Sequence, residues 1–438
     1  MSSASPQPQD AHIERLDDLE ISRLRADFPI LERSINGSAL IYLDSGATSQ
    51  KPSCVYEAEQ HYYESFNAAV HRGAHSLAVE ATDIFEQARS TVSNFIGANE
   101  NELVWTSNAT EALNLITYSF ANASAGLGGE AAKRFALGEG DEIVVTELEH
   151  HANLIPWQEL AARTGATLKY IPVDEHGALR MDLAEQIISA RTRVLAFTHV
   201  SNVLGSITDV SALVALARNV GALTVLDGCQ SVPHLPVDVK KLDVDFMAFS
   251  GHKMLGPTGI GGLYGRSELL DAMPPFLTGG SMITSVTMEK AEFLPAPMRF
   301  EAGTQRISQA HGLATAVSYL EEVGMDRVAA WEEHLGERML TGLRQIPGIR
   351  VLGPEAGAAR IGTAPFTVDG VHPHDVGQFL DARGIAVRVG HHCAQPLHRA
   401  LGVNASTRAS TYLYNTTSDI DALLNAVADV CGYFGVSK

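Results

Sequence analysis

Residues 244–253 read Val244-Asp245-Phe246-Met247-Ala248-Phe249-Ser250-Gly251-His252-Lys253. The apolar run, bounded by serine and glycine, predicts a buried strand with Lys253 just beyond its carboxyl end. Burial disfavours a charged amine, and the neutral amine is the form that makes a Schiff base. Taken alone, the stretch is equally compatible with a surface lysine beside a glycine turn.

Other β-rich runs precede this strand, and helical patterns lie between several of them. We expect strands at 142–146, 167–171, 194–198, 223–226 and 245–249, and amphipathic helices at 155–163 and 210–220. Strands and helices that alternate at this spacing predict parallel βαβ units and a doubly wound α/β sheet. Ligands bind beyond the carboxyl ends of the strands in such sheets. One crevice is therefore expected to hold the polar residues His150, His199, Asn202, Asp227 and Lys253.

Two of these residues together predict a cofactor. An aspartate that faces a pyridinium nitrogen and a lysine that binds an aldehyde are the pair that pyridoxal 5'-phosphate (PLP) needs, and Asp227 and Lys253 supply it. Ala109 and Thr110 follow a predicted strand and open a helical pattern. The free N–H groups and the dipole of a helix N-terminus favour a phosphate, although an ordinary N-cap would look the same.

Further side chains complete the predicted cofactor site. His150 has a flat imidazole that could stack on the cofactor ring, and Gln230, Ser250 and His252 are candidates for hydrogen bonds to the ring hydroxyl and the phosphate. Each of these signals is weak alone, since solvated or core residues fit equally well. Their order and spacing are what favour a PLP site.

Cys393 is the candidate nucleophile. It lies in a loop rich in glycine and histidine, close to Arg388, and nearby cationic groups favour the reactive thiolate. A loop cysteine without such context is more often a bystander. Arg408 is the candidate clamp for a substrate carboxylate because a guanidinium binds it with two parallel hydrogen bonds; a surface arginine is the alternative.

Composition limits the function classes. The 438 residues carry 32 basic and 51 acidic side chains, a net charge of -19, which argues against nucleic acid or an anionic membrane as the main partner. No apolar segment is long enough to span a bilayer. The first ten residues lack the pattern of a secretory signal, and the four cysteines lack paired spacing. We therefore expect a cytoplasmic protein with free thiols.

The expected domain organisation has three parts. Residues 1–20 are predicted to form a disordered tail, 21–300 a large PLP-binding domain, and 301–438 a small C-terminal domain. Within the large domain, residues 21–40 are expected to pack on the small domain.

The chain resembles a known family in several motifs. The segments 199–205, 227–234 and 250–253 resemble the fold-type I, class V aminotransferase-like family of PLP enzymes. Segments 300–304 and 388–394 narrow the resemblance to the SUF-type cysteine desulfurases, also called the group II or selenocysteine lyase-like branch. This implies an α/β fold-type I transferase with a mostly parallel seven-stranded sheet in the large domain, a smaller α/β C-terminal domain, and a homodimer with active sites between subunits.

The resemblance also implies roles for single residues. The catalytic residues would be Lys253, Cys393 and His150, and no metal is implied. Lys253 would hold the PLP aldehyde, Asp227 the pyridine nitrogen and Gln230 the ring hydroxyl. Arg408 would bind the substrate carboxylate with help from Asn202 and Arg388. The phosphate would be bound by Ala109, Thr110, Ser250 and His252, with Thr304 reaching in from the partner subunit. Cys229 departs from the family, which usually has alanine there.

The implied reaction is the conversion of L-cysteine to L-alanine. Lys253 would remove the proton on the substrate Cα, and the Cys393 thiolate would attack the substrate sulfur and become a persulfide. That persulfide would supply iron–sulfur cluster assembly through a SUF-type acceptor protein. A small zinc-containing scaffold is one candidate, with His374 exchanging into its zinc site; a pair of histidines on a surface turn is an equally good interpretation.

Three other functions stay open at this point. Selenocysteine lyase, which makes alanine and selenide, is the nearest alternative. A metal-dependent hydrolase would use the histidine clusters at 149–151, 372–375 and 391–393 as zinc ligands, but leaves Lys253 and Asp227 unexplained. A catalytically silent PLP-fold scaffold is disfavoured because every expected cofactor residue is present.

Overall fold

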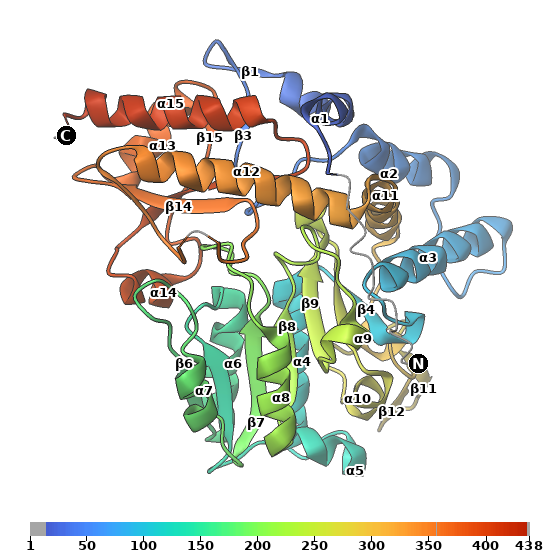
Figure 1. Ribbon diagram of the computed structural model, residues 1–438. Helices are drawn as coiled ribbons and strands as arrows, with labels where there is room; N and C mark the ends of the chain where they lie inside the picture. Colours follow the sequence, from blue (N-terminus) through green and yellow to red (C-terminus); the bar gives the residue numbers. More distant parts are fainter. Residues whose placement is uncertain (1–14, 356, 436–438) are drawn as a thin grey trace, which may run out of the picture.

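A seven-stranded sheet forms the centre of the computed structural model, which describes residues 15–355 and 357–435 (Figure 1). Strands β5 to β9 run parallel, whereas β10 is antiparallel to both of its neighbours. The order across the sheet is β4 (Leu103–Thr106), β10 (Gly261–Gly265), β9 (Phe246–Ser250), β8 (Leu223–Asp227), β7 (Thr192–Thr198), β5 (Glu142–Thr146) and β6 (Thr167–Ile171).

Helices cover both faces of this sheet, as its alternating side chains require. Phe246 and Ala248 of β9 lie in one hydrophobic core, with α4 (Ala109–Ser124) and α6 (Ile155–Thr164). Met247 and Phe249 of the same strand lie in the other, with α8 (Val210–Val220) and α11 (Ile307–Val323). The prediction of a doubly wound α/β fold is therefore confirmed.

The C-terminal part builds a second, smaller sheet. It is four-stranded and antiparallel, in the order β13 (Ile349–Val351), β14 (Thr363–Val368), β17 (Ser406–Ser410) and β16 (Arg388–Gly390). Its helices are α12 (Met325–Gln345), α13 (Pro373–Asp381) and α15 (Thr417–Tyr433), and α12 and α15 run side by side in Figure 1. The short helix α14 (Gln395–Ala400) follows the loop that carries Cys393.

The N-terminal segment contacts this second sheet region. Strand β3 (Ile41–Tyr42) pairs in parallel with β15 (Ile385–Ala386). Arg25, at the end of α1 (Asp18–Arg25), donates to the Tyr414 carbonyl oxygen at 2.9 Å, and Asn36 Nδ2 donates to the Asp381 carbonyl oxygen at 2.8 Å. Most of the tail predicted for residues 1–20 lies outside the described residues. Residues 18–20 belong to α1 because Asp17 and Glu20 form a capping box.

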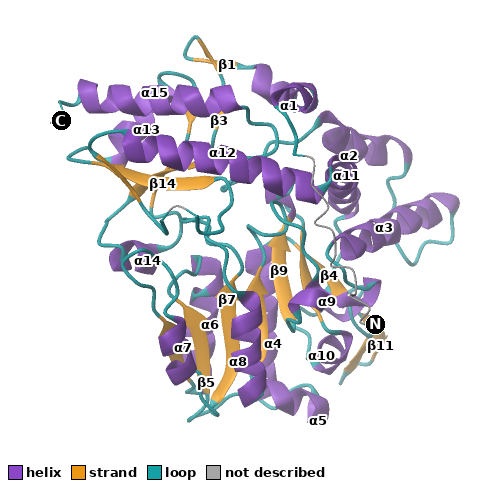
Figure 2. Cartoon of the chain, viewed as in Figure 1, coloured by secondary structure: helices purple, strands orange, loops and turns teal. Residues whose placement is uncertain are grey.

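The packing of helix α11 indicates where the boundary between the two domains lies. The sequence analysis placed this boundary at residue 301. The helix packs against α2 (Ser53–Ser65) and α3 (Ser76–Phe95), on the side of the large sheet. We therefore propose that the small domain begins near Gly324, where α11 ends. The other elements, drawn by type in Figure 2, are β1 (Ser34–Ile35), β2 (Ser38–Ala39), α5 (Gly129–Ala132), α7 (Met181–Ile187), α9 (Val239–Leu242), α10 (Ser267–Ala272), β11 (Ile283–Val286) and β12 (Ala291–Phe293).

None of the described helices combines the length and the hydropathy that a membrane span requires.

Candidate active site

A cavity of about 500 Å³ lies beyond the carboxyl ends of the parallel strands. It brings together the residues predicted to act on the cofactor or substrate except Thr304, which lines a separate small pocket with Trp105 and Arg306. His199, which was expected in the same crevice, does not line it. The predicted residues that line the cavity are Ala109, Thr110, His150, Asn202, Asp227, Gln230, Ser250, His252, Lys253, Arg388, Cys393 and Arg408.

Adjacent strands place Asp227 and Lys253 in this cavity. Asp227 is the last residue of β8 and is 4% exposed, and its Oδ1 accepts a hydrogen bond from the Cys229 N–H at 2.9 Å. Lys253 ends the short 3-10 turn Gly251–Lys253 that follows β9. The carboxylate and the amine thus enter the same cavity from the ends of two neighbouring strands.

The turn that carries Lys253 is held by a segment that the sequence analysis missed. The His252 carbonyl oxygen accepts hydrogen bonds from Thr48 Oγ1 at 3.0 Å, from the Ser49 N–H at 3.1 Å and from Lys51 Nζ at 2.9 Å. Leu255, two residues beyond Lys253, has a φ of +64°, a strained value for a side chain of this type. Several donors on one carbonyl stabilise a turn that the local sequence would not adopt by itself.

An anion site is formed where α4 begins. Asn108 caps the helix by accepting the Glu111 N–H at 3.1 Å, and the Ala109 N–H donates to Ser250 Oγ at 2.9 Å. A Cβ at Gly261 would lie 2.6 Å from the Phe249 carbonyl oxygen and 2.8 Å from Asn108 Cα. Glycine at that position therefore lets β10 and β9 approach the helix N-terminus closely. A helix N-terminus and a buried hydroxyl suit a phosphate.

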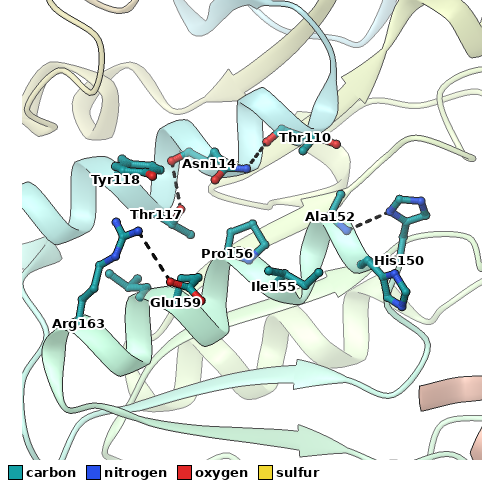
Figure 3. A pocket seen from close by; sticks show the side chains of 12 residues that line it. Thr110, Asn114, Thr117, Tyr118, His150, Ala152, Ile155, Pro156, Glu159 and Arg163 are labelled. Carbon is teal, nitrogen blue, oxygen red and sulfur yellow. Dashed lines mark hydrogen bonds and ion pairs between the residues drawn. The ribbon is translucent and has the colours of Figure 1, made fainter. Parts of the chain in front are cut away.

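His150 lies in the cavity wall as a neutral ring. Its Nδ1 accepts the Ala152 N–H at 3.0 Å, so the proton of the neutral imidazole is on Nε2. Burial, followed by the charge of Lys253, lowers the pKa of His150 to about 4. Figure 3 shows its ring at one end of a second pocket of about 310 Å³ between α4 and α6, which shares Thr110 and Ala152 with the main cavity.

Buried beside His150 is Glu149. It accepts hydrogen bonds from Thr146 Oγ1 at 2.5 Å, Asn153 Nδ2 at 2.6 Å and the Thr198 N–H at 3.0 Å. Burial raises the pKa of Glu149 to about 8, so the carboxyl is largely protonated at neutral pH. The sequence analysis considered Glu149 only as a zinc ligand. Among the described residues, no group of three or more histidine, cysteine, aspartate or glutamate side chains is arranged to hold a metal ion.

Two arginines meet on Asp44 at the small-domain side of the cavity. Arg388 donates from Nε at 3.2 Å and from Nη2 at 2.7 Å, and Arg408 Nη2 lies 3.5 Å from Asp44 Oδ1. Arg408 also donates to the Asn202 carbonyl oxygen at 2.7 Å, and its buried Nε has no hydrogen-bond partner. Burial lowers the pKa of Arg408 to about 10, which leaves it charged at neutral pH. The site can therefore accept a further carboxylate.

The loop of Cys393 is exposed but anchored. Cys393 has a φ of +56° and His392 of +50°, both in the left-handed region. The Cys393 carbonyl oxygen accepts the His151 N–H at 2.7 Å, and Asn202 Nδ2 donates to the His392 carbonyl oxygen at 2.7 Å. These hydrogen bonds from the large domain hold the thiol at the edge of the cavity.

Cys229 also lines the cavity. Its Sγ lies 3.7 Å from Ser250 Oγ, and burial raises its pKa to about 12, so the thiol stays protonated. This state suits a packing role, since the thiolate is the reactive form.

The model of the class V aminotransferase family matches residues 41–423, most of the chain. The chain belongs to this family. A probable cysteine desulfurase of Mycobacterium leprae is 54% identical to it over 419 residues, which cover 95% of this chain and 98% of the relative. A cysteine desulfurase of Haloferax volcanii is 45% identical over 93% of this chain and 96% of its own length.

Solved structures give the same result. The apo cysteine desulfurase of Thermococcus onnurineus is 39% identical and superposes with a TM-score of 0.87, covering 94% of this chain and 98% of that chain. The cysteine desulfurase CsdA of Escherichia coli is 38% identical with a TM-score of 0.84, over 94% and 98% of the two chains. The fold-type I architecture predicted from the sequence is confirmed.

The family is PLP-dependent, and the cavity fits that cofactor. A helix N-terminus and Ser250 lie where an anion would bind, and the Asp227 carboxylate would pair with a cation. Lys253 enters the same cavity and His150 presents an uncharged ring. Phosphate, pyridinium nitrogen and aldehyde thus each have a residue of matching chemistry.

Proposed function

We propose that the protein is a cysteine desulfurase that converts L-cysteine to L-alanine and leaves the sulfur on Cys393 as a persulfide. The observation that carries this is one cavity that holds Lys253, Asp227 and Arg408 together with an anchored, exposed cysteine. The relatives that cover nearly the whole chain bear the same name. None of these names is that of a selenocysteine lyase, so that alternative is not favoured.

Each residue of the cavity has its own role in the proposed reaction. PLP, when bound, supplies an electron sink for the substrate Cα, and Asp227 keeps its pyridine nitrogen protonated. Arg408, with Asn202 and Arg388, binds the substrate carboxylate and orients Cα towards the amine of Lys253. Lys253 removes the Cα proton and returns a proton later, as a general base and acid. The Cys393 thiolate attacks the substrate sulfur, the carbon–sulfur bond breaks, and the carbon fragment takes up a proton to become alanine.

Phosphate binding is assigned to the N-terminus of α4, with Ala109 and Thr110, and to Ser250 and His252. We assign the ring hydroxyl to Gln230, whose Nε2 donates to the Gly46 carbonyl oxygen at 2.8 Å and fixes the side chain. His150 is assigned to stacking on the ring. Its neutral state above pH 4 keeps a second positive charge away from the pyridinium.

Two variants test this function. Cys393→Ser should still bind cysteine but form no protein persulfide, because the hydroxyl is a poor sulfur acceptor. Lys253→Ala should retain some PLP through the phosphate and ring contacts but release no alanine. Alanine is measured by amino-acid analysis and persulfide by mass spectrometry. Turnover-dependent persulfide on Cys54, Cys229 or Cys431 in Cys393→Ser, or appreciable turnover in Lys253→Ala, would contradict the assignments.

A sulfur-acceptor protein of a SUF-type iron–sulfur assembly pathway is the proposed partner. His374 lies exposed in the first turn of α13 and lines a groove of about 490 Å³ with Val387 and Val389, the residues on either side of Arg388. Neutral imidazole is a competent zinc ligand, and His374 lies along the strand that leads to Cys393. This placement supports a zinc-containing scaffold as acceptor.

We predict that such a scaffold accelerates alanine production severalfold and that His374→Ala abolishes the acceleration while basal activity is kept. His372→Asn, which keeps a side chain able to accept the His374 N–H at the N-cap of α13, is the matched control and should retain it. The measurement is the alanine rate with and without the zinc-loaded acceptor. Undiminished acceleration in His374→Ala would remove the zinc-exchange proposal and leave the desulfurase function intact.

A cytoplasmic homodimer is the proposed form of the enzyme, with Thr304 of each chain completing the phosphate site of the other. Thr304 lies outside the cavity of its own chain, which supports a role in the partner's site.

A further inference from the structure

The side chain of Thr48 contacts His252 from outside the active-site cavity. Thr48 Oγ1 lies 3.1 Å from His252 Nδ1 and 3.0 Å from the His252 carbonyl oxygen. His252 lines the cavity, whereas Thr48 does not. The hydroxyl of Thr48 therefore reaches the cavity only through His252, and no step of the proposed mechanism uses it.

Neighbouring groups fix this hydroxyl and direct its proton. Tyr42 Oη donates to the Thr48 carbonyl oxygen at 2.8 Å, which holds the backbone. Lys51 Nζ lies 3.4 Å from Thr48 Oγ1. Because an ammonium group only donates, Lys51 occupies a lone pair of the hydroxyl oxygen. The hydroxyl proton of Thr48 is consequently left for an acceptor on His252.

His252 offers two acceptors for this one proton. If the proton goes to the carbonyl oxygen, the imidazole carries its own proton on Nδ1 and donates it to Thr48 Oγ1. If the proton goes to Nδ1, the imidazole carries its own proton on Nε2. The carbonyl oxygen does not depend on Thr48, since the Ser49 N–H donates to it at 3.1 Å and Lys51 Nζ at 2.9 Å. The two arrangements therefore differ chiefly in the tautomer of His252.

The tautomer decides what His252 can offer to the cavity. Burial, followed by the charges of Lys253 and Lys51, lowers the pKa of His252 to about 4, so the ring is neutral at pH 7. A neutral imidazole donates from one nitrogen and accepts at the other. Nδ1 faces Thr48, and Nε2 has no hydrogen-bond partner within the part of the chain that the structure describes. Nε2 is thus the nitrogen left for a ligand.

A phosphate requires one of the two tautomers. Its oxygens accept hydrogen bonds at neutral pH, so they bind an N–H and repel a bare nitrogen lone pair. His252 lines the cavity together with Ser250 and Thr110, the residues assigned to the phosphate. A proton on Nε2 suits that position, and it is present only when Nδ1 accepts from Thr48.

We propose that Thr48 is a positioning residue for the phosphate of the cofactor. Its hydroxyl donates to His252 Nδ1 and keeps His252 in the tautomer that donates from Nε2. The His252 carbonyl oxygen retains its hydrogen bonds from Ser49 and Lys51 in this arrangement. The proposal rests on the assignment of His252 to the phosphate under the proposed function.

The test compares binding of PLP with binding of pyridoxal, which has the same ring and aldehyde but no phosphate. Thr48→Val replaces the hydroxyl by a methyl group of similar size. In titrations of the full chain, followed by cofactor absorbance, this variant should bind PLP roughly fivefold more weakly, the factor of about one hydrogen bond, and bind pyridoxal as the wild type does. Thr48→Ser keeps the hydroxyl and should restore the affinity for PLP.

Ser49→Ala is the matched control. Ser49 Oγ also donates to the His252 carbonyl oxygen, at 3.1 Å, but has no contact with the imidazole. This variant should keep the wild-type ratio of the PLP and pyridoxal affinities. If Thr48→Val weakens both ligands equally, or neither, Thr48 has no role toward the phosphate and the proposal is overturned.

A spectroscopic measurement on the wild type gives a second test that needs no variant to fold. Histidine ¹⁵N spectra of the PLP-bound enzyme should show His252 protonated on Nε2 alone, and a proton on Nδ1 overturns the proposal. If His252→Ala loses no preference for PLP over pyridoxal, the phosphate assignment fails and the proposal fails with it. A wild type that makes no alanine from cysteine contradicts the desulfurase function, whereas the two titrations still report on Thr48.

Discussion

At the scale of single residues, three buried histidines make the stability of the fold sensitive to acid. They are His150, His199 and His252. Burial lowers the pKa of each to about 4, followed by the charge of Lys253 for His150 and His252. The unfolded chain therefore binds more protons than the folded chain between about pH 6.5 and pH 4. The stability that these groups contribute is fully present above pH 6.5 and is lost as the pH falls through this window.

His199 isolates this effect because burial is the one cause of its shift and its Nδ1 has no partner in the described structure. Lowering the pH from 7 to 5 should cost about 2 kcal/mol through His199 alone. We predict that His199→Gln reduces the loss of unfolding free energy between these pH values by that amount, measured by urea denaturation at a fixed PLP concentration. The exposed His176→Gln should leave the loss unchanged. An equal loss in His199→Gln and the wild type would contradict the assignment.

The sequence could predict those site residues that a local pattern is enough to place. Lys253, Asp227 and Cys393 follow strands or a glycine-rich loop, and a local pattern is enough to place them. Asp44 and Lys51 were missed because they lie 344 residues from Arg388 and 201 residues from His252, with no local signal of either contact. Long-range pairing depends on the tertiary fold and cannot be read from spacing.

At the scale of elements, β10 is the strand of the large sheet that sequence patterns did not reveal. Its residues Gly261 and Gly262 are typical of a turn, yet they form a buried antiparallel strand between β4 and β9. The glycines are needed by packing rather than by backbone conformation, because a Cβ at Gly261 would meet the backbone of Phe249 and Asn108. The apolar runs of β5, β7, β8 and β9 were predictable because both of their faces are buried.

This close approach leads to a prediction about the phosphate site. Gly261→Ala should push β10 away from the N-terminus of α4, destabilise the protein by about 1–3 kcal/mol, and weaken PLP binding severalfold. Thermal unfolding and fluorescence titration with PLP measure the two effects. Gly432→Ala, in α15 with nothing within 4 Å of the added Cβ, is the control and should not weaken PLP binding. Unchanged PLP affinity in Gly261→Ala would contradict the role of this contact.

At the scale of the whole molecule, the site lies between the two domains. Asp227 ends β8 of the large sheet and Lys253 lies in the turn after β9, whereas Arg388 and Arg408 lie on β16 and β17 of the small sheet and Cys393 in the loop after β16. A buried pair, His234 Nδ1 and Glu332 Oε2 at 2.9 Å, joins the segment after β8 to α12. Hydrogen bonds from Asn202 and His151 to the Cys393 loop join the domains again at the cavity. The two arginines proposed to bind the substrate carboxylate are therefore fixed relative to Asp227 and Lys253 by contacts on two sides.

The proposed dimer can be tested with mixed dimers, in which the two chains carry different substitutions. We predict that Lys253→Ala and Thr304→Glu are each nearly inactive, the second because a carboxylate would repel the phosphate. If Thr304 acts in the partner's site, a mixed dimer has one site with both defects and one with none. Half of the dimers in an equal mixture are mixed, so about a quarter of wild-type alanine production should return after subunit exchange.

The matched control mixes Lys253→Ala with Cys393→Ser. Both residues belong to the cavity of the same chain, so every site in that mixture carries one defect and no activity should return. If Thr304 acts within its own chain, the first mixture should be as inactive as the second, because no site would then be intact. If alanine production returns only in the mixture of Lys253→Ala and Thr304→Glu, the active site is shared between subunits. Only a shared site can combine the intact Lys253 of one chain with the intact Thr304 of the other.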